Sequence, residues 1–221
     1  MMDKIEFVLF GLDLLEPMAF VTNMLVMLSC LYGYYRTKNV DSAFGRYWRL
    51  FFISFALASF FGGLSHVFWN YWWFYGKILP WFFGVVSTSF AALAMLEART
   101  ISPKAKSRWQ MVIFLKALLV LVLAYSQWSF LFVAIDTILT LLGFAGIYGV
   151  TVMKQGYPSV RFVVYGVLVL LPSAFIFLLK YDLHRWMNRE DLSHILMVIA
   201  IQLFAISVLR HKKSVTRTSL G

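Results

Sequence analysis

Long runs without a charged residue are the feature that most constrains how this chain folds. A helix needs about 20 apolar residues to cross the hydrocarbon core of a bilayer. Five runs of 18 residues or more contain no Asp, Glu, Lys or Arg: Pro17–Tyr35, Leu50–Gly76, Ile78–Leu96, Phe162–Leu179 and Leu192–Leu209. Two further runs are each interrupted once, Trp109–Gln127 by Lys116 and Trp128–Met153 by Asp136. We therefore predict an all-α, polytopic membrane protein, a seven-transmembrane-helix bundle.

The composition and the placement of basic residues support this prediction and orient the bundle. Only 14% of the residues are charged, against about a quarter in soluble proteins. The net charge is +10, and most basic residues lie in alternate connections between the runs and after the last run. They are Arg36, Lys38, Arg46, Arg49, Arg99, Lys104, Lys106, Arg108, Lys154, Arg161, Arg210, Lys212, Lys213 and Arg217. Because basic loops stay in the cytoplasm, we expect the N-terminus outside and the C-terminus inside, with membrane lipids and no nucleic acid as partners.

Three parts are expected along the chain. Residues 1–15 form an amphipathic segment on the outer surface, and within it Asp3–Leu15 is expected to be a short interfacial helix. The first span then begins at Pro17, since proline is favoured at the first helical position. Residues 16–210 form the seven-helix membrane domain, and residues 211–221 form a basic cytoplasmic tail. The single cysteine, Cys30, lies in the first span, so we expect no internal disulfide.

Several ionisable residues fall at one level of the predicted bundle. Ionisable side chains within spans are costly and usually face the protein interior or a wet cavity. In the predicted topology the principal ones share the outer half of the membrane: Glu16, His66, Asp136, Glu190, Asp191 and His194. Because they come from different spans, this shared depth predicts a polar site inside the bundle.

The spacing of these residues points to a zinc site. Glu190 and His194 are separated by four positions and Asp191 and His194 by three, so each pair lies on one helix face. With His66 from another span, they supply two imidazoles and a carboxylate, a common set of catalytic zinc ligands. Zinc would activate a water molecule for hydrolysis. Glu16, or whichever of Glu190 and Asp191 is not a ligand, would accept its proton or orient an imidazole.

Structural explanations of the same residues stay open. Asn188 is a good N-cap, and acids in the first turn, such as Glu190 and Asp191, stabilise a helix start without any further role. His66 taken alone is explained equally well as a core histidine that donates to a backbone carbonyl.

Other polar or small residues also have structural explanations. Asp136 and Lys116 lie on neighbouring spans and could form an ion pair. Gly62–Gly63 would permit close packing of helices. His184 and His211 are expected to be solvated, in a loop and in the tail.

Three short stretches carry a resemblance to a known family. They are "EPMAFVTNMLVML" (Glu16–Leu28), "GGLSHVFW" followed by "KILPW" (Gly62–Trp69 and Lys77–Trp81), and "EDLSHIL" (Glu190–Leu196). Together with seven spans, they resemble the CREST superfamily of membrane hydrolases, which includes alkaline ceramidases and adiponectin-type receptors. The resemblance covers most of the chain in layout.

The resemblance implies a fold, an activity and ligand positions. It implies a seven-helix membrane hydrolase that binds zinc, with His66 and His194 at ligand positions. Glu190 stands where the family has its other final-span histidine. Gly62 stands in place of a serine, and Lys77 in place of an acidic residue.

Three hypotheses follow for function. The first is a zinc-dependent membrane hydrolase of a lipid amide or ester, similar to ceramidases, whose lipid-like substrate enters between helices. The alternative is a non-enzymatic receptor or assembly subunit that retains a degraded hydrolase site. A transporter that uses Asp136 and Lys116 ranks lowest, because no pair of spans broken by Pro or Gly is evident in corresponding halves.

Overall fold

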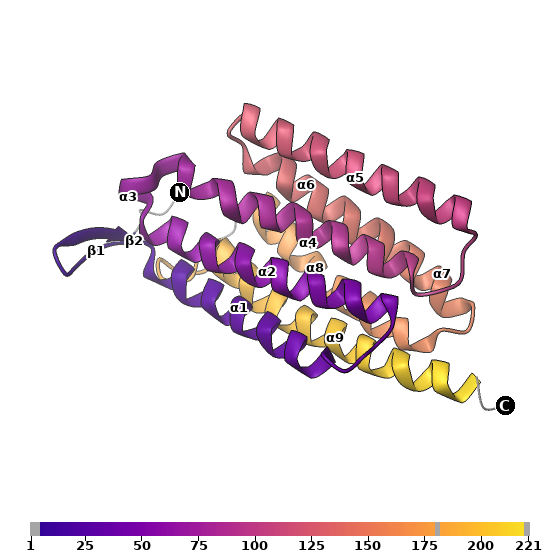
Figure 1. Ribbon diagram of the computed structural model, residues 1–221. Coiled ribbons are helices and arrows are strands. Elements are labelled where there is room, and N and C mark those ends of the chain that lie inside the picture. The colour runs from indigo at the N-terminus through magenta and orange to yellow at the C-terminus, as the bar shows by residue number, and fades with distance from the viewer. Residues whose placement is uncertain (1–4, 180–181, 219–221) are drawn as a thin grey trace.

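The chain is a multi-pass membrane protein built as a helical bundle. The computed structural model describes residues 5–179 and 182–218, and seven spans in this part are long and apolar enough to cross a membrane. Figure 1 shows them side by side. The helical elements are α1 (Pro17–Thr37), α2 (Ala43–Val67), α3 (Trp69–Trp72), η1 (Trp73–Lys77), α4 (Ile78–Leu96), α5 (Pro103–Ser126), α6 (Phe130–Thr140), η2 (Leu141–Tyr148), α7 (Gly149–Lys154), η3 (Pro158–Val160), α8 (Arg161–Leu178) and α9 (Arg189–Thr218). The prediction of seven membrane-spanning helices is confirmed.

Local sequence signals set the helix starts. Pro17 is at the first position of α1, where its fixed φ and missing N–H cost nothing. Ser42 caps α2, because its hydroxyl accepts a hydrogen bond from the N–H of Gly45 at 3.1 Å. Ser102 caps α5 in the same way. The second charge-free run extends beyond α2, and its aromatic end forms α3 and η1.

The segment before α1 is a β-hairpin, so the expected helix within Asp3–Leu15 is wrong. Strands β1 (Glu6–Leu9) and β2 (Leu12–Leu15) pair antiparallel, with Leu9 opposite Leu12. Phe10 and Gly11 between them have φ of 51° and 77°, which are the two positive values that a tight type I′ hairpin turn requires. Asp3 lies outside the described residues. A short apolar run does not reveal by periodicity alone whether it is helix or strand.

Aromatic and aliphatic side chains form the main core, chiefly between α1, α2, α4, α8 and α9. Trp48 is fully buried, and its ring lies against Phe51 and Phe204, with centroids 5.2 Å and 4.9 Å away. α5, the uppermost helix in Figure 1, packs against α4 and α6 and is not part of this core.

The opposite half of the bundle has a polar interior. We call it the Glu16 end, where the hairpin meets α1 and where α9 begins. Thr22, Ser65 and Asp191 are buried there, at no more than 3% exposure. The Glu16 end therefore provides a cluster of buried hydrogen-bonding groups beside the aromatic core.

His211 does not behave as a solvated tail residue, so that expectation is wrong. α9 continues past the membrane run as far as Thr218, and this continuation packs His211 against α2 and η3. Its side chain is 4% exposed, its ring centroid is 4.4 Å from that of Phe44, and its Nδ1 is 3.2 Å from the Ser159 hydroxyl. His184 is exposed, as expected. The last three residues of the predicted tail lie outside the described residues.

The packing of α8 on α9 predicts an effect of Gly166→Ala. A Cβ atom at Gly166 would lie 2.4 Å from Phe204 Cε1 and 3.2 Å from the Ala200 carbonyl oxygen. We expect a loss of unfolding free energy of about 1–3 kcal/mol, the usual cost of overpacking a core, measured by denaturant unfolding in detergent. Gly84→Ala is the control, since its Cβ would meet only Val133 at 3.8 Å, and this variant should be neutral or more stable by up to about 1 kcal/mol. Equal stability of the two variants would contradict this packing.

Candidate functional site

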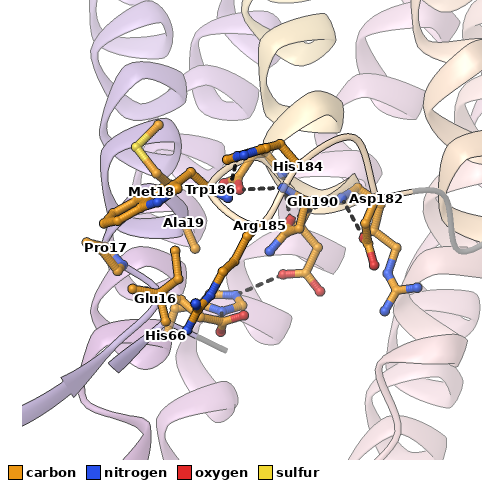
Figure 2. A pocket seen from close by; sticks show the side chains of 14 residues that line it. Glu16, Pro17, Met18, Ala19, His66, Asp182, His184, Arg185, Trp186 and Glu190 are labelled. Carbon is orange, nitrogen blue, oxygen red and sulfur yellow. Dashed lines mark hydrogen bonds and ion pairs between the residues drawn. The ribbon is translucent and has the colours of Figure 1, made fainter. Parts of the chain in front are cut away.

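A pocket opens at the Glu16 end of the bundle, with a cavity of about 140 Å³. It is formed by the start of α1, the end of α2, the loop before α9 and the first turn of α9 (Figure 2). Its lining contains most of the predicted site residues: Glu16, His66, Glu190 and Asp191. The sequence prediction that these residues come together from three different spans is supported by their positions here.

Glu16 and Glu190 lie at opposite nitrogens of the His66 ring. Glu16 Oε2 is 3.0 Å from His66 Nδ1, and Glu190 Oε2 is 3.4 Å from His66 Nε2. Glu16 has φ of 48° at the junction between β2 and α1, a left-handed conformation that is uncommon for a residue with a side chain. The Glu16 carboxylate thus holds one ring nitrogen and leaves the other facing Glu190.

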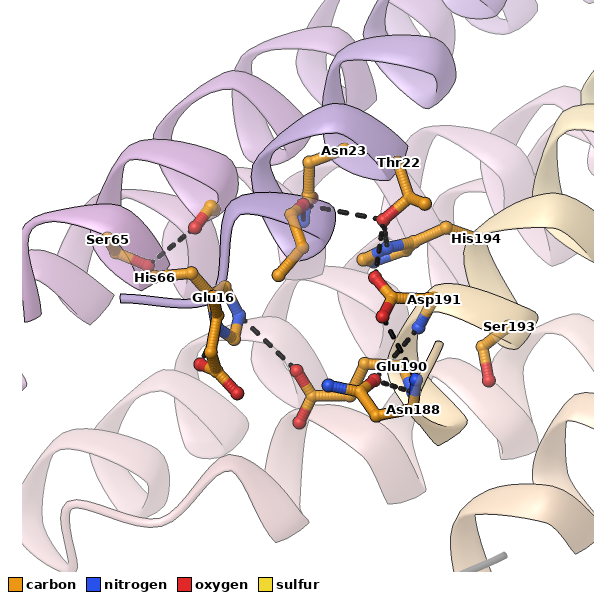
Figure 3. A network of polar contacts seen from close by, with 12 residues as sticks. Glu16, Thr22, Asn23, Ser65, His66, Asn188, Glu190, Asp191, Ser193 and His194 are labelled. Carbon is orange, nitrogen blue, oxygen red and sulfur yellow. Dashed lines mark hydrogen bonds and ion pairs between the residues drawn. The ribbon is translucent and has the colours of Figure 1, made fainter. Parts of the chain in front are cut away.

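His194 is held by Thr22, which sequence reasoning missed. The Thr22 hydroxyl is 2.9 Å from His194 Nδ1 and donates to Asp191 Oδ1 at 2.8 Å (Figure 3). A hydroxyl has one proton and two lone pairs, so donation to Asp191 leaves it an acceptor for the Nδ1–H of His194. In that arrangement Nδ1 carries the proton and Nε2 is the basic nitrogen; the Met18 carbonyl oxygen, 3.0 Å from the Thr22 hydroxyl, is a second acceptor for its one proton. Within the described part of the chain, His194 Nε2 has no hydrogen-bond partner.

Asp191 is fully engaged as a helix-capping residue. The Asn188 side-chain oxygen accepts hydrogen bonds from the N–H groups of Glu190 and Asp191, at 2.8 and 3.1 Å. Asp191 Oδ2 in turn accepts from the Asn188 N–H at 3.1 Å. These reciprocal bonds form a capping box. With Oδ1 bonded to Thr22, both oxygens of Asp191 are used, which confirms the capping explanation for Asp191 and leaves Glu190 as the acid that faces His66.

The donors at this site suit zinc in chemistry and partly in spacing. Metal-binding histidines usually have their other ring nitrogen held by a hydrogen bond, and both His66 and His194 do. Two ligands about 2.1 Å from a tetrahedral zinc ion lie about 3.4 Å apart, the separation of His66 Nε2 and Glu190 Oε2. Among the described residues, however, no group of three or more His, Cys, Asp or Glu side chains is arranged to hold a metal ion. His194 would have to turn toward the other two donors.

Gly62 and Lys77, where the sequence differs from the CREST pattern, do not line the pocket. A Cβ atom at Gly62 would lie 3.1 Å from Asn23 Oδ1, and one at Gly63 would lie 3.1 Å from Asn23 Cβ. The two glycines therefore permit the close approach of α1 and α2, as expected. Lys77 Nζ lies over the ring of Trp69, 5.8 Å from its centroid.

Asp136 belongs to a separate network. Its carboxylate is 2.6 Å from Lys116 Nζ and accepts hydrogen bonds from the hydroxyls of Thr88 and Thr140 at 3.1 and 3.3 Å. Lys116 also donates to Thr140. The expected ion pair between Asp136 and Lys116 is confirmed, and neither residue lines the pocket.

The capping box predicts different effects for the two neighbouring acids. Asp191→Ala removes acceptors for the Asn188 N–H and for Thr22, and it should lower the unfolding free energy by about 1–3 kcal/mol. Glu190→Ala removes neither, and its effect should stay below about 1 kcal/mol. Denaturant unfolding in detergent measures both variants. A loss with Glu190→Ala as large as with Asp191→Ala would show that the cap does not distinguish them.

The second network predicts a recoverable loss of stability. Asp136→Leu leaves Lys116 without its carboxylate inside the membrane and should cost on the order of 3 kcal/mol. The double variant with Lys116→Met removes both charges and should regain most of this loss. Thermal unfolding in detergent compares the two variants, and a double variant as unstable as the single one would exclude charge pairing as the cause.

Comparison with known proteins places the chain in one family. No curated protein matches it. A family model described as a family of unknown function, DUF6962, matches residues 18–213. This match includes all seven spans except the first residue of α1, together with His66, Glu190, Asp191 and His194. The chain therefore belongs to the DUF6962 family.

Proposed function

We propose that the chain is a zinc-dependent membrane hydrolase that acts on a lipid amide or ester. The observation that carries this proposal is the contact between His66 Nε2 and Glu190 Oε2 at 3.4 Å. Two acceptors at this separation, at the edge of an open pocket, suit a shared cation. The resemblance of the stretches around Glu16, His66 and His194 to CREST hydrolases supports the same function.

His66, Glu190 and His194 would hold the zinc ion. When bound, zinc supplies Lewis-acid activation of a carbonyl group and of water. Glu16 orients His66 through Nδ1 and keeps Nε2 available. Thr22, itself held by Asp191, does the same for His194. Asp191 therefore acts through Thr22, and Glu16 acts through His66.

The reaction consumes one water molecule. The carbonyl carbon of the lipid gains a hydroxyl group as its bond to nitrogen or oxygen breaks, and the departing atom gains the proton. The 14% side-chain exposure of Glu16 places a carboxylate at the pocket wall, where it can accept and return this proton.

The distribution of basic residues supports an outer location for the site. Most basic residues lie at the end of the bundle opposite Glu16. They lie in connections such as 38–42 and 97–102 or in the helix turns next to them. By the positive-inside rule that end is cytoplasmic. The pocket then opens at the outer surface, where a membrane lipid can reach it from the bilayer.

Metal analysis of the purified full-length protein tests the proposal. We expect roughly one zinc ion per chain, lost on chelation. His66→Ala, His194→Ala and Glu190→Gln should each lower the zinc content, and each should abolish the hydrolysis of fluorescent lipid amides and esters.

His184→Ala is the matched control for metal content. His184 lies at the same pocket but is not a proposed ligand, so this variant should keep its zinc. Unchanged lipid turnover in zinc-free protein would falsify the proposal. Loss of zinc from the His184 variant alone would show that the ligands are misassigned.

The second candidate is a receptor or assembly subunit with a structural polar cluster. Two observations favour it. No three-residue metal group is found among the described residues, and the contacts of His66 with Glu16 and Glu190 can also be read as ion pairs. A protonated His66 between Glu16 and Glu190 would satisfy both acids without a metal. In that case wild-type protein contains no zinc, and His66→Ala lowers stability without any activity to lose.

A further inference from the structure

The loop before α9 forms an ordered two-residue turn at the pocket. The His184 N–H donates to the Met187 carbonyl at 3.1 Å, and the Met187 N–H donates to the His184 carbonyl at 2.9 Å. The Trp186 N–H donates to His184 Nδ1 at 3.2 Å. These bonds fix the turn with Arg185 and Trp186 at its tip, and both residues line the pocket.

Arg185 and Arg189 both line this pocket, and neither has an anionic partner among the described residues. Neither Arg185 nor Arg189 forms a side-chain hydrogen bond or ion pair with any residue that the structure describes. The four carboxylates that line the pocket each have another contact. Glu16 and Glu190 contact His66, Asp182 accepts from the backbone N–H of Arg189, and Asp191 accepts from the Asn188 N–H and from Thr22. Arginine forks bind phosphate and carboxylate groups through paired hydrogen bonds, so two unpaired forks at one pocket suit an anionic ligand.

The surroundings of the turn point to a lipid as the source of that anion. Leu183 and Trp186 flank Arg185 and are 53% and 51% exposed. Exposed Trp beside a helix terminus is typical of the membrane interface. The pocket lies where α1 and α9 begin, which is the level of lipid headgroups. Lipid phosphate is the anionic group at the headgroup level of a bilayer, and its oxygens match the paired donors of an arginine fork.

We propose that Arg185 and Arg189 bind the phosphate of a lipid headgroup, so that the substrate is a phosphate-bearing lipid. In Figure 2 the Arg185 side chain extends from the loop toward the side of the pocket where Glu16 and His66 lie. A phosphate held there places the adjoining ester or amide of the lipid near His66. The claim that this lipid is the substrate rests on the proposed hydrolase function. The claim that the arginines bind its headgroup does not, because binding is measured without turnover.

Binding of fluorescent phosphatidylglycerol to the full-length protein in maltoside micelles tests the inference. Diacylglycerol with the same acyl chains is the phosphate-free comparison. Wild type should bind phosphatidylglycerol at least tenfold more tightly. Arg185→Gln and Arg189→Gln should each weaken binding about tenfold, the usual worth of a charge-assisted hydrogen bond. Arg185→Lys, which keeps the charge but not the fork, should recover part of the loss.

Arg36→Gln is the charge-matched control, because Arg36 lies at the other end of α1 and bonds Tyr32. It should bind as wild type does. Equal affinity for the two lipids, or no effect of either glutamine variant in folded protein, would overturn the headgroup site. Competition by sodium phosphate as strong as that by phosphatidylglycerol would overturn the lipid assignment.

The same preparations separate this inference from the proposed function. Arginine-dependent binding without turnover of any lipid would refute the hydrolase and leave the headgroup site intact. Turnover of diacylglycerol and phosphatidylglycerol at equal rates, unaffected by the arginine variants, would refute the headgroup site and leave the hydrolase.

Discussion

A polar group buried in a membrane bundle needs a partner from the protein itself, and this constraint organises the Glu16 end of the molecule. Thr22 on α1 meets the constraint for two residues of α9, because its hydroxyl donates to Asp191 and accepts from His194. Hydrogen bonds thereby join the two helices at this level, and Gln202 joins them again further along by donating to Ser29. With α1 fixed against α9, the residue before α1, Glu16, reaches the imidazole of His66 on α2. The geometry of the pocket depends on this tie.

The two polar networks inside the spans differ in a way that bears on function. The Asp136 carboxylate is 1% exposed and pairs with Lys116. It also accepts hydrogen bonds from Thr88 and Thr140, so its charge is fully compensated. Such a closed network needs no ligand and serves to join α4, α5 and α6. At the Glu16 end, Glu190 is 37% exposed, and in the described part of the chain neither Arg185 nor Arg189 pairs with an anion. A ligand can pair with polar groups that lack a partner at a cavity. The groups of the Asp136 network already have partners, so that network offers a ligand nothing to bind.

Much of the fold could be predicted from the sequence, because a charge-free run of about 20 residues is what a helix needs to cross a bilayer. The depth of His66 and Glu190 follows from the same runs, and that is why their approach, with His66 Nε2 3.4 Å from Glu190 Oε2, could be anticipated. The hairpin at Phe10 and Gly11 could not, since a short apolar segment has no distinctive period and two positive φ angles decide it. Thr22 lies within the stretch Glu16–Leu28, but it carries no charge that would single it out as a site residue. The burial of His211 depends on how far α9 continues beyond the membrane run, which hydropathy does not indicate.

The neighbouring acids Glu190 and Asp191 show why spacing alone could not tell which of them faces His66. Glu190 and Asp191 are both within one turn of His194, so the i, i+3 and i, i+4 rules accept either. Capping geometry separates them, because only the third residue of a helix can return a hydrogen bond to the N-cap backbone. Asp191 occupies that position and spends its second oxygen on Thr22, while Glu190, one residue earlier, projects toward α2 and His66. An Asn at the N-cap thus engages Asp191 in capping and leaves the Glu190 carboxylate facing His66 at the pocket.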